Sequence, residues 1–473
     1  MTALARPLAA LLGERLAAGG ASGAEGASGR RPQVVLGGDT RESTAEICGW
    51  LAAGLAAGGA AVRYAGVIPT PGVSFLAGEL GADAGVVVSA SHNPYPDNGI
   101  KLLDAQGFKW SEAAEAELEQ RLRAAAETPA PAPAPPRPPS APPLQVPPLP
   151  PLPPLIIEID LRERYLRHLA STIAAPGGTG PAPGSTAAGG GPPLAGLRVV
   201  LDTGNGAASA YAGELFGRLG AEVTVLGAAP DGRNVNLGCG STAPAGLAAA
   251  VVAAGAHLGA AFDGDADRCI LVDERGEVRD GDAILYLWAT RLLAEGRLAP
   301  PAIVATTMSN LGLERALARR GIAVMRCGVG DRLVVDTMRR DGILLGGEQS
   351  GHIVRLDLAA TGDGLLTAVQ MAALVHRAGR PLSELLAGFR RYPQTLVNVR
   401  VASKPDLATL PRVTAAARAV EDELGADGRL VLRYSGTEPL ARVMIEGPDQ
   451  QTIETLAGHL AAILADELGQ PAG

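Results

Sequence analysis

Short apolar runs that end in polar, glycine-rich loops recur along this chain, and they restrict its fold more than any other feature. Residues 33–41 read QVVLGGDTR and residues 86–101 read VVVSASHNPYPDNGIK, and comparable runs begin at Leu197, His257 and Ala302. A short apolar run bounded by turn residues is typical of a buried strand. Because segments with helical spacing lie between the runs, the pattern predicts parallel sheets covered by helices, and therefore an α/β protein.

The expected elements follow one another at a regular rhythm. The first twenty residues place leucines at helical spacing and interrupt them with charges, which indicates an amphipathic helix. A helix from Ser43 to the glycine pair at 58–59 separates the first strand from a second strand at 61–67. Further strands are expected at 197–202, 222–226, 257–262, 302–305, 322–326 and 441–446, and further helices at 160–173, 207–219, 246–254 and 311–320.

Two segments of biased composition interrupt this pattern. Residues 128–155 are rich in Pro and Ala, and residues 174–193 are rich in Gly, Ala and Pro. Neither composition can build a core, so we interpret the first as a polyproline-like linker and the second as an exposed loop insertion. The expected domains are three α/β domains at 1–127, 156–275 and 276–390, and a smaller α+β domain at 391–473.

Composition excludes several classes of partner. A net charge of −8 and an isoelectric point near 5.4 supply no basic stripe for nucleic acid or for an anionic membrane surface. No stretch reaches the roughly 20 apolar residues that a membrane helix requires. The four cysteines are scattered without CxxC spacing, which fits reduced thiols in a cytoplasm. We expect a soluble cytoplasmic enzyme, a monomer or a homodimer, that acts on a small molecule.

Three aspartates follow the strand expected at 257–262. Asp263, Asp265 and Asp267 are separated by single residues, the first of them a glycine. Carboxylates at this spacing repel one another unless a hard divalent cation joins them, and oxygen ligands favour Mg²⁺ or Ca²⁺ over Zn²⁺. A solvated acidic turn is the alternative interpretation. The aspartates are therefore a candidate metal site.

The loop after Val88 carries Ser89, Ser91 and His92 and includes Lys101 at its end. A serine in such a loop is by itself more often a turn former than a reactive group. However, α/β folds usually present their chemistry where a buried strand runs into a loop. Only three of the 41 basic residues are lysines, so Lys101 is a candidate for a titratable or hydrogen-bonding role.

A loop near the C-terminus has the composition of a phosphate site. Arg433, Ser435, Gly436 and Thr437 combine a guanidinium, two hydroxyls and a glycine whose amide can approach an anion closely. Arg442 adds a second guanidinium after a short turn. These are the groups from which a phosphate cradle is built.

Two further loops carry polar groups of a different kind. Glu348 and Ser350 lie among glycines and offer an acceptor and a donor to sugar hydroxyls. Arg41 and Arg332 each occupy a loop that follows a strand. For either arginine alone, a surface salt bridge is the preferred interpretation.

Four motifs in sequence order resemble those of the α-D-phosphohexomutase superfamily. They are SASHNP at 89–94, DGDADR at 263–268, GEQSGH at 347–352 and RYSGTEP at 433–439. The resemblance implies four domains around a central cleft, three of them α/β and the last related to the TATA-binding-protein-like fold. Cys239-Gly-Ser-Thr, Gly330-Asp-Arg and Thr361-Gly-Asp-Gly are similar to the phosphoglucosamine mutase branch, which implies the interconversion of glucosamine 6-phosphate and glucosamine 1-phosphate.

By this resemblance Ser91 is the phosphorylated serine and Ser89 is a structural neighbour. The phosphoserine donates its phosphoryl group to a hydroxyl of the sugar phosphate, which gives a bisphosphate, and the other phosphate then returns to the serine. Lys101 is the main candidate for a general acid or base, and His92 and His352 are weaker ones.

The resemblance also implies the ligands of this reaction. One Mg²⁺ is held by Ser91 and the three aspartates, and Arg268 and Lys101 offset the remaining negative charge. The remaining residues are assigned to the sugar, namely Glu348, Ser350, His352 and Arg332, and to phosphate, namely Arg433, Ser435, Gly436, Thr437 and Arg442.

The chain departs from the family pattern at two places. Family members begin with a Phe-Gly-Thr-Asp-Gly-x-Arg-Gly-like strand and loop, so the first domain is expected to lack that strand and its arginine. Residues 242–245 read Thr-Ala-Pro-Ala where the family often has Thr-His-Pro-Glu. Phosphomannomutase or phosphoglucomutase activity, a non-catalytic sugar-phosphate-binding protein and a metal-dependent phosphatase remain alternatives.

Overall fold

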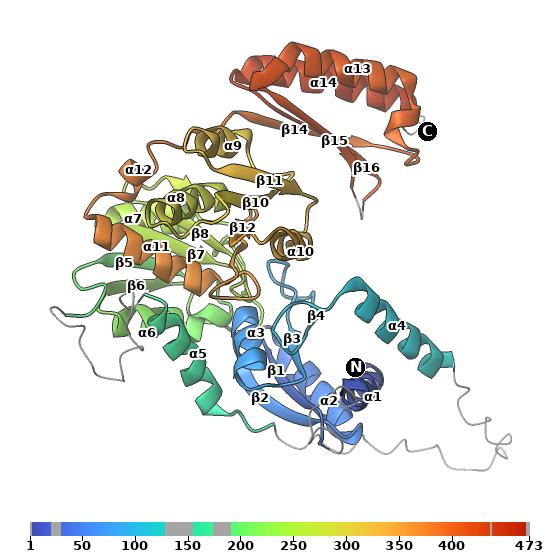
Figure 1. The fold of residues 1–473 in the computed structure, drawn as a ribbon, viewed down its shortest axis with the longest axis vertical. Coiled ribbons are helices and arrows are strands. Elements are labelled where there is room, and N and C mark those ends of the chain that lie inside the picture. Colours follow the sequence, from blue (N-terminus) through green and yellow to red (C-terminus); the bar gives the residue numbers. More distant parts are fainter. Residues whose placement is uncertain (1, 20–29, 128–154, 174–190, 436–437, 470–473) are drawn as a thin grey trace, which may run out of the picture. The chain divides into compact units, whose positions relative to one another are not determined.

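The computed structural model describes residues 2–19, 30–127, 155–173, 191–435 and 438–469 (Figure 1). The predicted linker, except for its last residue, and most of the predicted insertion lie outside the described residues, as do Gly436 and Thr437. Nearly all the strands and helices expected from the sequence are present within a few residues of their expected bounds.

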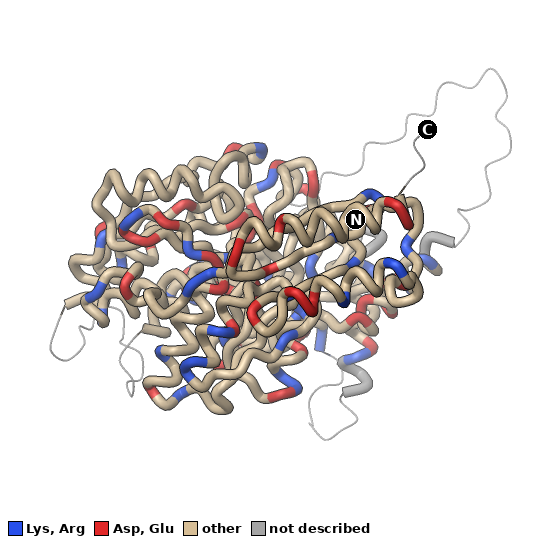
Figure 2. The backbone as a smooth tube through the Cα atoms, turned by 90° about the horizontal axis from the view of Figure 1, so that it is seen from above, with Lys and Arg blue, Asp and Glu red and all other residues tan. Residues whose placement is uncertain are grey.

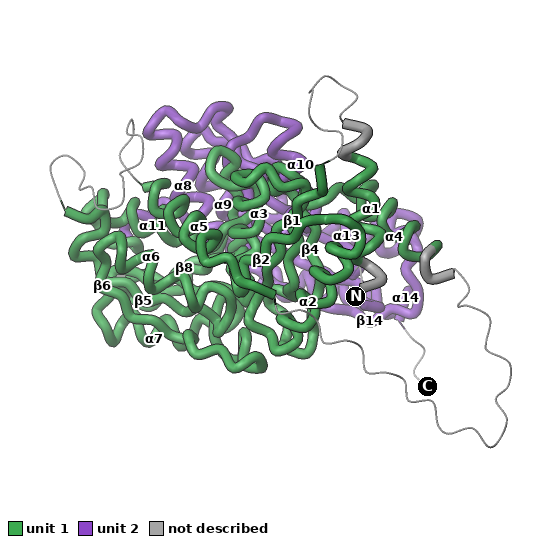
Figure 3. The backbone as a smooth tube through the Cα atoms, turned by 90° about the horizontal axis from the view of Figure 1, so that it is seen from below, with its two compact units in different colours: residues 1–281, 350–383 green, residues 282–349, 384–473 purple. Residues whose placement is uncertain are grey.

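Basic and acidic residues are interspersed along the described backbone (Figure 2). No helix in the part of the chain that the structure describes is long and apolar enough to cross a membrane. The chain forms two compact units, residues 1–281 with 350–383 and residues 282–349 with 384–473 (Figure 3).

The first sheet of the first unit has the strand order β2-β1-β3-β4. Its strands are β1 (Gln33–Gly38), β2 (Ala61–Val67), β3 (Ala84–Val88) and β4 (Ile100–Leu103). β1 is parallel to β2 and β3, whereas β4 is antiparallel to β3. Lys101 therefore lies in a strand, opposite Val87, and not in the loop where the sequence interpretation put it, because the apolar residues around it pair with β3.

Four helices cover this sheet. They are α1 (Thr2–Gly19), α2 (Thr44–Ala57), α3 (Thr70–Glu79) and α4 (Glu112–Glu127). Leu8 and Leu11 of α1 are buried together with Leu51 and Leu55 of α2 against apolar residues of β1 and β3. The predicted helix at the start of the chain is thus confirmed, and Leu8, Leu11 and Leu12 form part of the first core.

The second sheet of the first unit has the order β6-β5-β7-β8-β9. Its strands are β5 (Arg198–Asp202), β6 (Glu222–Leu226), β7 (Leu258–Phe262), β8 (Cys269–Asp273) and β9 (Val278–Arg279). The helix expected at 207–219 is a 3-10 helix at Ala207–Ala210 followed by α6 (Ala212–Arg218). The other elements are α5 (Ile159–Ser171), α7 (Ala245–Ala254), β13 (Ile353–Arg355) and α11 (Gly364–Ala378).

The second unit contains a parallel α/β part and an antiparallel part. In the first, β10 (Ala302–Thr306) pairs in parallel with β11 (Ala323–Cys327) and β12 (Leu345–Gly347). Its helices are α8 (Gly281–Ala294), α9 (Leu311–Ala318) and α10 (Asp331–Asp341). The antiparallel part contains β14 (Gln394–Arg400), β15 (Arg429–Tyr434), β16 (Leu440–Glu446), α13 (Pro411–Leu424) and α14 (Gln450–Leu468), in the sheet order β14-β16-β15. The expected α+β end of the chain is confirmed.

Candidate active site

Ser91 lies in the loop that follows β3, and its backbone is left-handed, with a φ of 51°. Its Oγ donates a hydrogen bond to Asp263 Oδ2 at 2.5 Å. Asp263 directly follows β7, so two loops at strand carboxyl ends bring these residues together. The backbone amide of Ser91 donates to Ser89 Oγ at 2.9 Å, which fixes the loop on the other side of Ser91.

The three aspartates form one buried cluster within the first unit. Asp263 and Asp265 are fully buried, Asp267 is almost so, and one carboxylate oxygen of each lies within 4.8 Å of the others. Asp265 Oδ2 accepts hydrogen bonds from Thr70 Oγ1 and from Lys101. Asp265 Oδ1 and Asp267 Oδ1 are buried and have no hydrogen-bond partner among the described residues. Buried carboxylate oxygens without a hydrogen-bond partner are suitable ligands for a hard cation.

Lys101 connects two of these carboxylates. Its Nζ lies 2.5 Å from Asp265 Oδ2 and 2.9 Å from Asp267 Oδ2. Burial acts to lower the pKa of Lys101, but the two carboxylates raise it above its ordinary value. Lys101 is therefore a protonated cation in this arrangement, and it offsets part of the negative charge of the cluster.

The aspartates differ in their proton affinity. Burial and the charges of Asp267 and Asp265 raise the pKa of Asp263 to about 7. Burial acts in the same direction on Asp267, but Lys101 and His352 hold its pKa well below the ordinary value. A cluster with one carboxyl that titrates near neutrality gains from a positive charge placed beside it.

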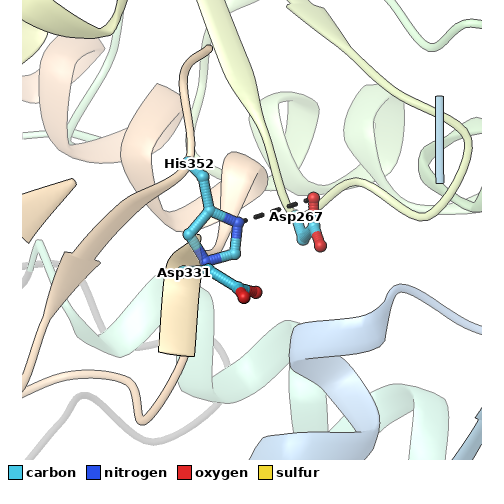
Figure 4. A group of neighbouring side chains, drawn as sticks. All are labelled: Asp267, Asp331 and His352. Atoms are coloured by element: carbon cyan, nitrogen blue, oxygen red, sulfur yellow. Dashed lines mark ion pairs between the residues drawn. The ribbon is translucent and has the colours of Figure 1, made fainter. Parts of the chain in front are cut away.

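His352 is buried and faces Asp267 (Figure 4). Its Nδ1 lies 3.6 Å from Asp267 Oδ1, and its Nε2 accepts a hydrogen bond from the amide of Gly362 at 3.0 Å. Since Nε2 is the acceptor, the ring proton lies on Nδ1, on the side of the aspartate. The structure thus places this predicted sugar residue against the metal-site carboxylates.

Arg268 and His92 lie at the edge of the cluster. Arg268 Nε is 4.0 Å from Asp263 Oδ2 and 4.0 Å from Asp267 Oδ1. His92 is exposed, and its Nδ1 is 3.5 Å from Ser91 Oγ. Partial burial of the ring and the charge of Arg268 lower the pKa of His92, so the ring is neutral at neutral pH.

The predicted phosphate residues lie in the second unit. Arg433 of β15 and Arg442 of β16 are directly opposite each other in the antiparallel pair, and both line a small pocket with Met308, Leu396, Val431 and Met444. Burial and the charge of Arg442 lower the pKa of Arg433. Two guanidinium groups on directly opposed positions make a candidate anion site, and Arg442 is also paired with Glu438 at 2.8 Å. Ser435 is buried beside them, and its carbonyl accepts from Lys404 Nζ at 2.6 Å.

The predicted sugar residues are divided between the units. Glu348 and Arg332 belong to the second unit, and Ser350 and His352 belong to the first. Glu348 Oε1 accepts from the amide of Gly330 at 3.2 Å, in the loop that begins α10.

Sequence reasoning misjudged Arg41 and missed the role of Asn236. Arg41 is 2% exposed and forms an ion pair with Asp39 whose side chains are both fully buried, so its interpretation as a surface salt bridge is wrong. Asn236 Nδ2 donates to the carbonyl of Ser91 at 2.9 Å. Their only sequence signal is a position in a loop after a strand, because their partners lie 50 and 145 residues away.

Four domain families match the chain in order. They are the phosphoglucomutase/phosphomannomutase alpha/beta/alpha domain I at residues 5–129, domain II at 192–276, domain III at 280–392 and the C-terminal domain at 396–463.

Full-length relatives agree with these matches. The chain is 44% identical over 443 residues to a phosphoglucosamine mutase of Solibacter usitatus, covering 93% of this chain and 91% of the relative. It is 45% identical over 436 residues to a phosphoglucosamine mutase of Moorella thermoacetica, covering 92% and 91%.

Solved structures show the same fold. A phosphoglucomutase/phosphomannomutase family protein from Burkholderia thailandensis matches with a TM-score of 0.71 at 23% identity, over 98% of this chain and 94% of that one. Aspergillus fumigatus N-acetylphosphoglucosamine mutase, solved in complex with GlcNAc-6P and magnesium, matches with a TM-score of 0.60 at 18% identity, over 84% and 92%. The chain belongs to the phosphoglucomutase/phosphomannomutase family, the α-D-phosphohexomutases.

Proposed function

We propose that this phosphohexomutase interconverts glucosamine 6-phosphate and glucosamine 1-phosphate through a phosphoserine at Ser91. The observation that carries the proposal is the contact of Ser91 Oγ with Asp263 in a buried cluster of three aspartates. The identity of about 44% to phosphoglucosamine mutases, over 93% of the chain, supports the choice of sugar. We expect the chain to act in the cytoplasm, as a monomer or homodimer.

The aspartate cluster fits a hard divalent cation such as Mg²⁺. Two buried carboxylate oxygens have no hydrogen-bond partner in the described parts of the chain, and the pKa of Asp263 is raised by its carboxylate neighbours. Asp263, Asp265, Asp267 and an oxygen on Ser91 would hold the ion. When bound, it supplies positive charge to the oxygens of the transferring phosphoryl group.

The side chains of the cluster then have complementary tasks. The phosphoryl group leaves Ser91 Oγ and bonds to the free hydroxyl of the sugar monophosphate, whose proton passes to a base. The other phosphoryl group of the resulting bisphosphate returns to Ser91. Protonated Lys101 offsets charge and gives a proton to the departing Ser91 Oγ, while neutral His92, 3.5 Å from that atom, takes the proton of the attacking hydroxyl. In the return step Lys101 regains its proton from Ser91 Oγ, and His92 gives its proton to the departing sugar oxygen.

The pair Arg433 and Arg442 is proposed to hold the phosphate that is not being transferred. This proposal is supported by their direct opposition across β15 and β16 and by the lowered pKa of Arg433. The proposed sugar-binding residues remain Glu348, Ser350, His352 and Arg332. The proposed domains, 1–127, 156–275, 276–390 and 391–473, follow the order of the four family matches.

A coupled assay with Mg²⁺ tests the function. We expect turnover of glucosamine 6-phosphate to exceed that of mannose or glucose 6-phosphate, and intact mass to show one phosphate that is lost in Ser91→Ala but kept in Ser171→Ala, a serine at the end of α5. Exclusive turnover of mannose or glucose phosphate would overturn the choice of sugar. Phosphate release without isomerisation would indicate a phosphatase, and absence of both phosphorylation and turnover would indicate a binding protein.

A further inference from the structure

Both terminal nitrogens of Arg41 bind the loop that carries Ser91, residues 89–98, here called the serine loop. Its Nη2 donates to the carbonyls of Ser91 at 2.9 Å and Asn93 at 2.8 Å, and its Nη1 donates to those of Pro94 and Asp97. Its Nε donates to Asp39 Oδ2 at 2.8 Å. Every N–H donor of the guanidinium is thereby used within the protein, so Arg41 has none to offer to a substrate.

The carboxylate of Asp39 is linked to the backbone amide of Ser91 through the hydroxyl of Ser89. Asp39 Oδ2 accepts from Ser89 Oγ at 2.6 Å, and Ser89 Oγ in turn accepts from the amide of Ser91 at 2.9 Å. Asp39 Oδ1 accepts from Thr44 Oγ1 at the start of α2, which fixes the carboxylate to the core of the first sheet. Both backbone polar groups of Ser91 are thus tied, directly or through one residue, to the Asp39–Arg41 pair.

Asn236 holds the same carbonyls from another element. It lies between β6 and α7, and its Nδ2 is 2.9 Å from the carbonyl oxygen of Ser91 and 3.4 Å from that of Asn93. The loop of the three aspartates, residues 263–267, closes the third side, because a Cβ added at Gly264 would come within 2.6 Å of the Ser91 carbonyl oxygen. The serine carbonyl is therefore enclosed by Arg41, Asn236 and Gly264.

We propose that Arg41 and Asn236 form a clamp that positions Ser91 for phosphoryl transfer. Serine rarely adopts a left-handed φ such as the 51° seen here, and such a conformation persists where surrounding contacts over-determine it. The clamp holds that conformation and thereby keeps Oγ beside Asp263. Arg41 and Asn236 are positioning residues, since their side chains bond to backbone carbonyls of the serine loop and, for Arg41, to Asp39. The kinetic test of this inference rests on the proposed function, because it measures mutase turnover.

Two variants remove the clamp from its two sides. Arg41→Lys keeps the charge but cannot reach four carbonyls with one ammonium. Asn236→Gly removes the amide and retains a residue that adopts the φ of 57° found at this position without strain. Arg63→Lys is the matched control, because Arg63 lies in β2 of the same sheet and pairs with Glu158.

Kinetics distinguish positioning from a purely structural role. Since small displacements of a reacting group can reduce turnover about a hundredfold, we expect kcat to fall about 100-fold in Arg41→Lys and about tenfold in Asn236→Gly, with KM within about threefold of wild type. Millimolar methylguanidine should restore part of kcat in Arg41→Ala. Arg63→Lys should retain wild-type kcat.

Hydrogen exchange tests the clamp independently of turnover. In both variants, exchange of the amides of residues 89–98 should accelerate while that of α2 and β1 stays as in wild type. If wild type turns over no hexose phosphate, the proposed function fails, and faster exchange confined to the serine loop still supports the clamp. The clamp is overturned if kcat and loop exchange are unchanged, or if exchange accelerates throughout the first sheet in Asn236→Gly. If Arg41→Lys fails to fold, kcat and hydrogen exchange of Asn236→Gly alone test the clamp.

Discussion

At the scale of single residues, the positive charge of Lys101 reduces the free-energy cost of burying the three aspartates together. The side chain is 18% exposed, and its Nζ contacts Asp265 and Asp267, so it compensates carboxylates that are out of contact with water. Removing one partner of a buried ion pair usually costs more than the pair itself contributes, because the other charge stays buried. The cluster should therefore become dependent on an added cation when Lys101 is lost.

Lys101→Met is expected to lower the free energy of unfolding by about 2–4 kcal/mol in the absence of divalent cations. Millimolar Mg²⁺ should recover more stability in the variant than in wild type, because the variant cluster has lost a competing positive charge. Urea unfolding with and without Mg²⁺ measures both effects, and Lys404→Met, outside the cluster, is the control. An equal gain from Mg²⁺ in wild type and Lys101→Met would show that Lys101 does not compensate the metal site.

At the scale of elements, two helices are capped by aspartates whose pKa values are shifted in opposite directions. The two caps should therefore affect the pH dependence of stability differently. Asp363 caps α11 by accepting from the amide of Leu366, and it also accepts from Tyr165 Oη of α5 at 2.9 Å. Burial raises its pKa to about 7. Asp449 caps α14 in the same way but is exposed, and its hydrogen bonds to Thr452 lower its pKa.

A raised pKa in the folded state means that the folded chain binds the proton more tightly than the unfolded chain does. Asp363 therefore contributes stability at acidic pH that is lost as the pH rises from about 4 towards 7, by at most about 1.4 kcal/mol per pH unit. Asp363→Asn, which can still cap the helix, should remove this slope. Chemical unfolding of both proteins between pH 5 and 8 provides the measurement.

Asp449→Asn is the matched control for this prediction. Its lowered pKa gives stability that is lost only as the pH falls through the folded pKa, below the range measured, so the slope between pH 5 and 8 should equal that of wild type. If Asp363→Asn also kept the wild-type slope, the buried carboxyl of Asp363 would not be the group that titrates.

The strands and loops also explain which site residues could be predicted from the sequence to lie together. The three aspartates could be predicted to lie together because a turn of six residues holds all of them, and Ser91 could be predicted beside a strand end because β3 is a continuous apolar run. Lys101 reaches the cluster only through the antiparallel pairing of β4 with β3. Periodicity describes which residues are buried, but it does not describe which strand pairs with which.

At the scale of the whole molecule, the α/β class, the antiparallel C-terminal part and the family were predicted correctly from local patterns. The burial of Arg41 was not predictable, because its acceptors are carbonyls of a loop about fifty residues away and an arginine near a strand end is usually exposed. The position of His352 against Asp267 was missed for the same reason. Contacts between loops depend on the completed fold, which no single segment encodes.

The two compact units carry the two kinds of charged site separately. Ser91 and the three aspartates lie in the first unit, and Arg433 and Arg442 lie in the second. A ligand that binds only the folded form stabilises the part that binds it, by about 2.7 kcal/mol at a hundredfold excess over its Kd. Scanning calorimetry is therefore expected to show Mg²⁺ raising the midpoint of one transition, and inorganic phosphate raising the midpoint of another.

Point variants assign the transitions. Asp265→Asn should abolish the shift caused by Mg²⁺ and leave the shift caused by phosphate, whereas Arg442→Gln should do the reverse. Because proteins of several domains often unfold in several steps, these shifts are separable only if the units unfold independently. One transition that both ligands raise, and that either variant affects for both ligands, would show instead that the two units unfold as a single cooperative body.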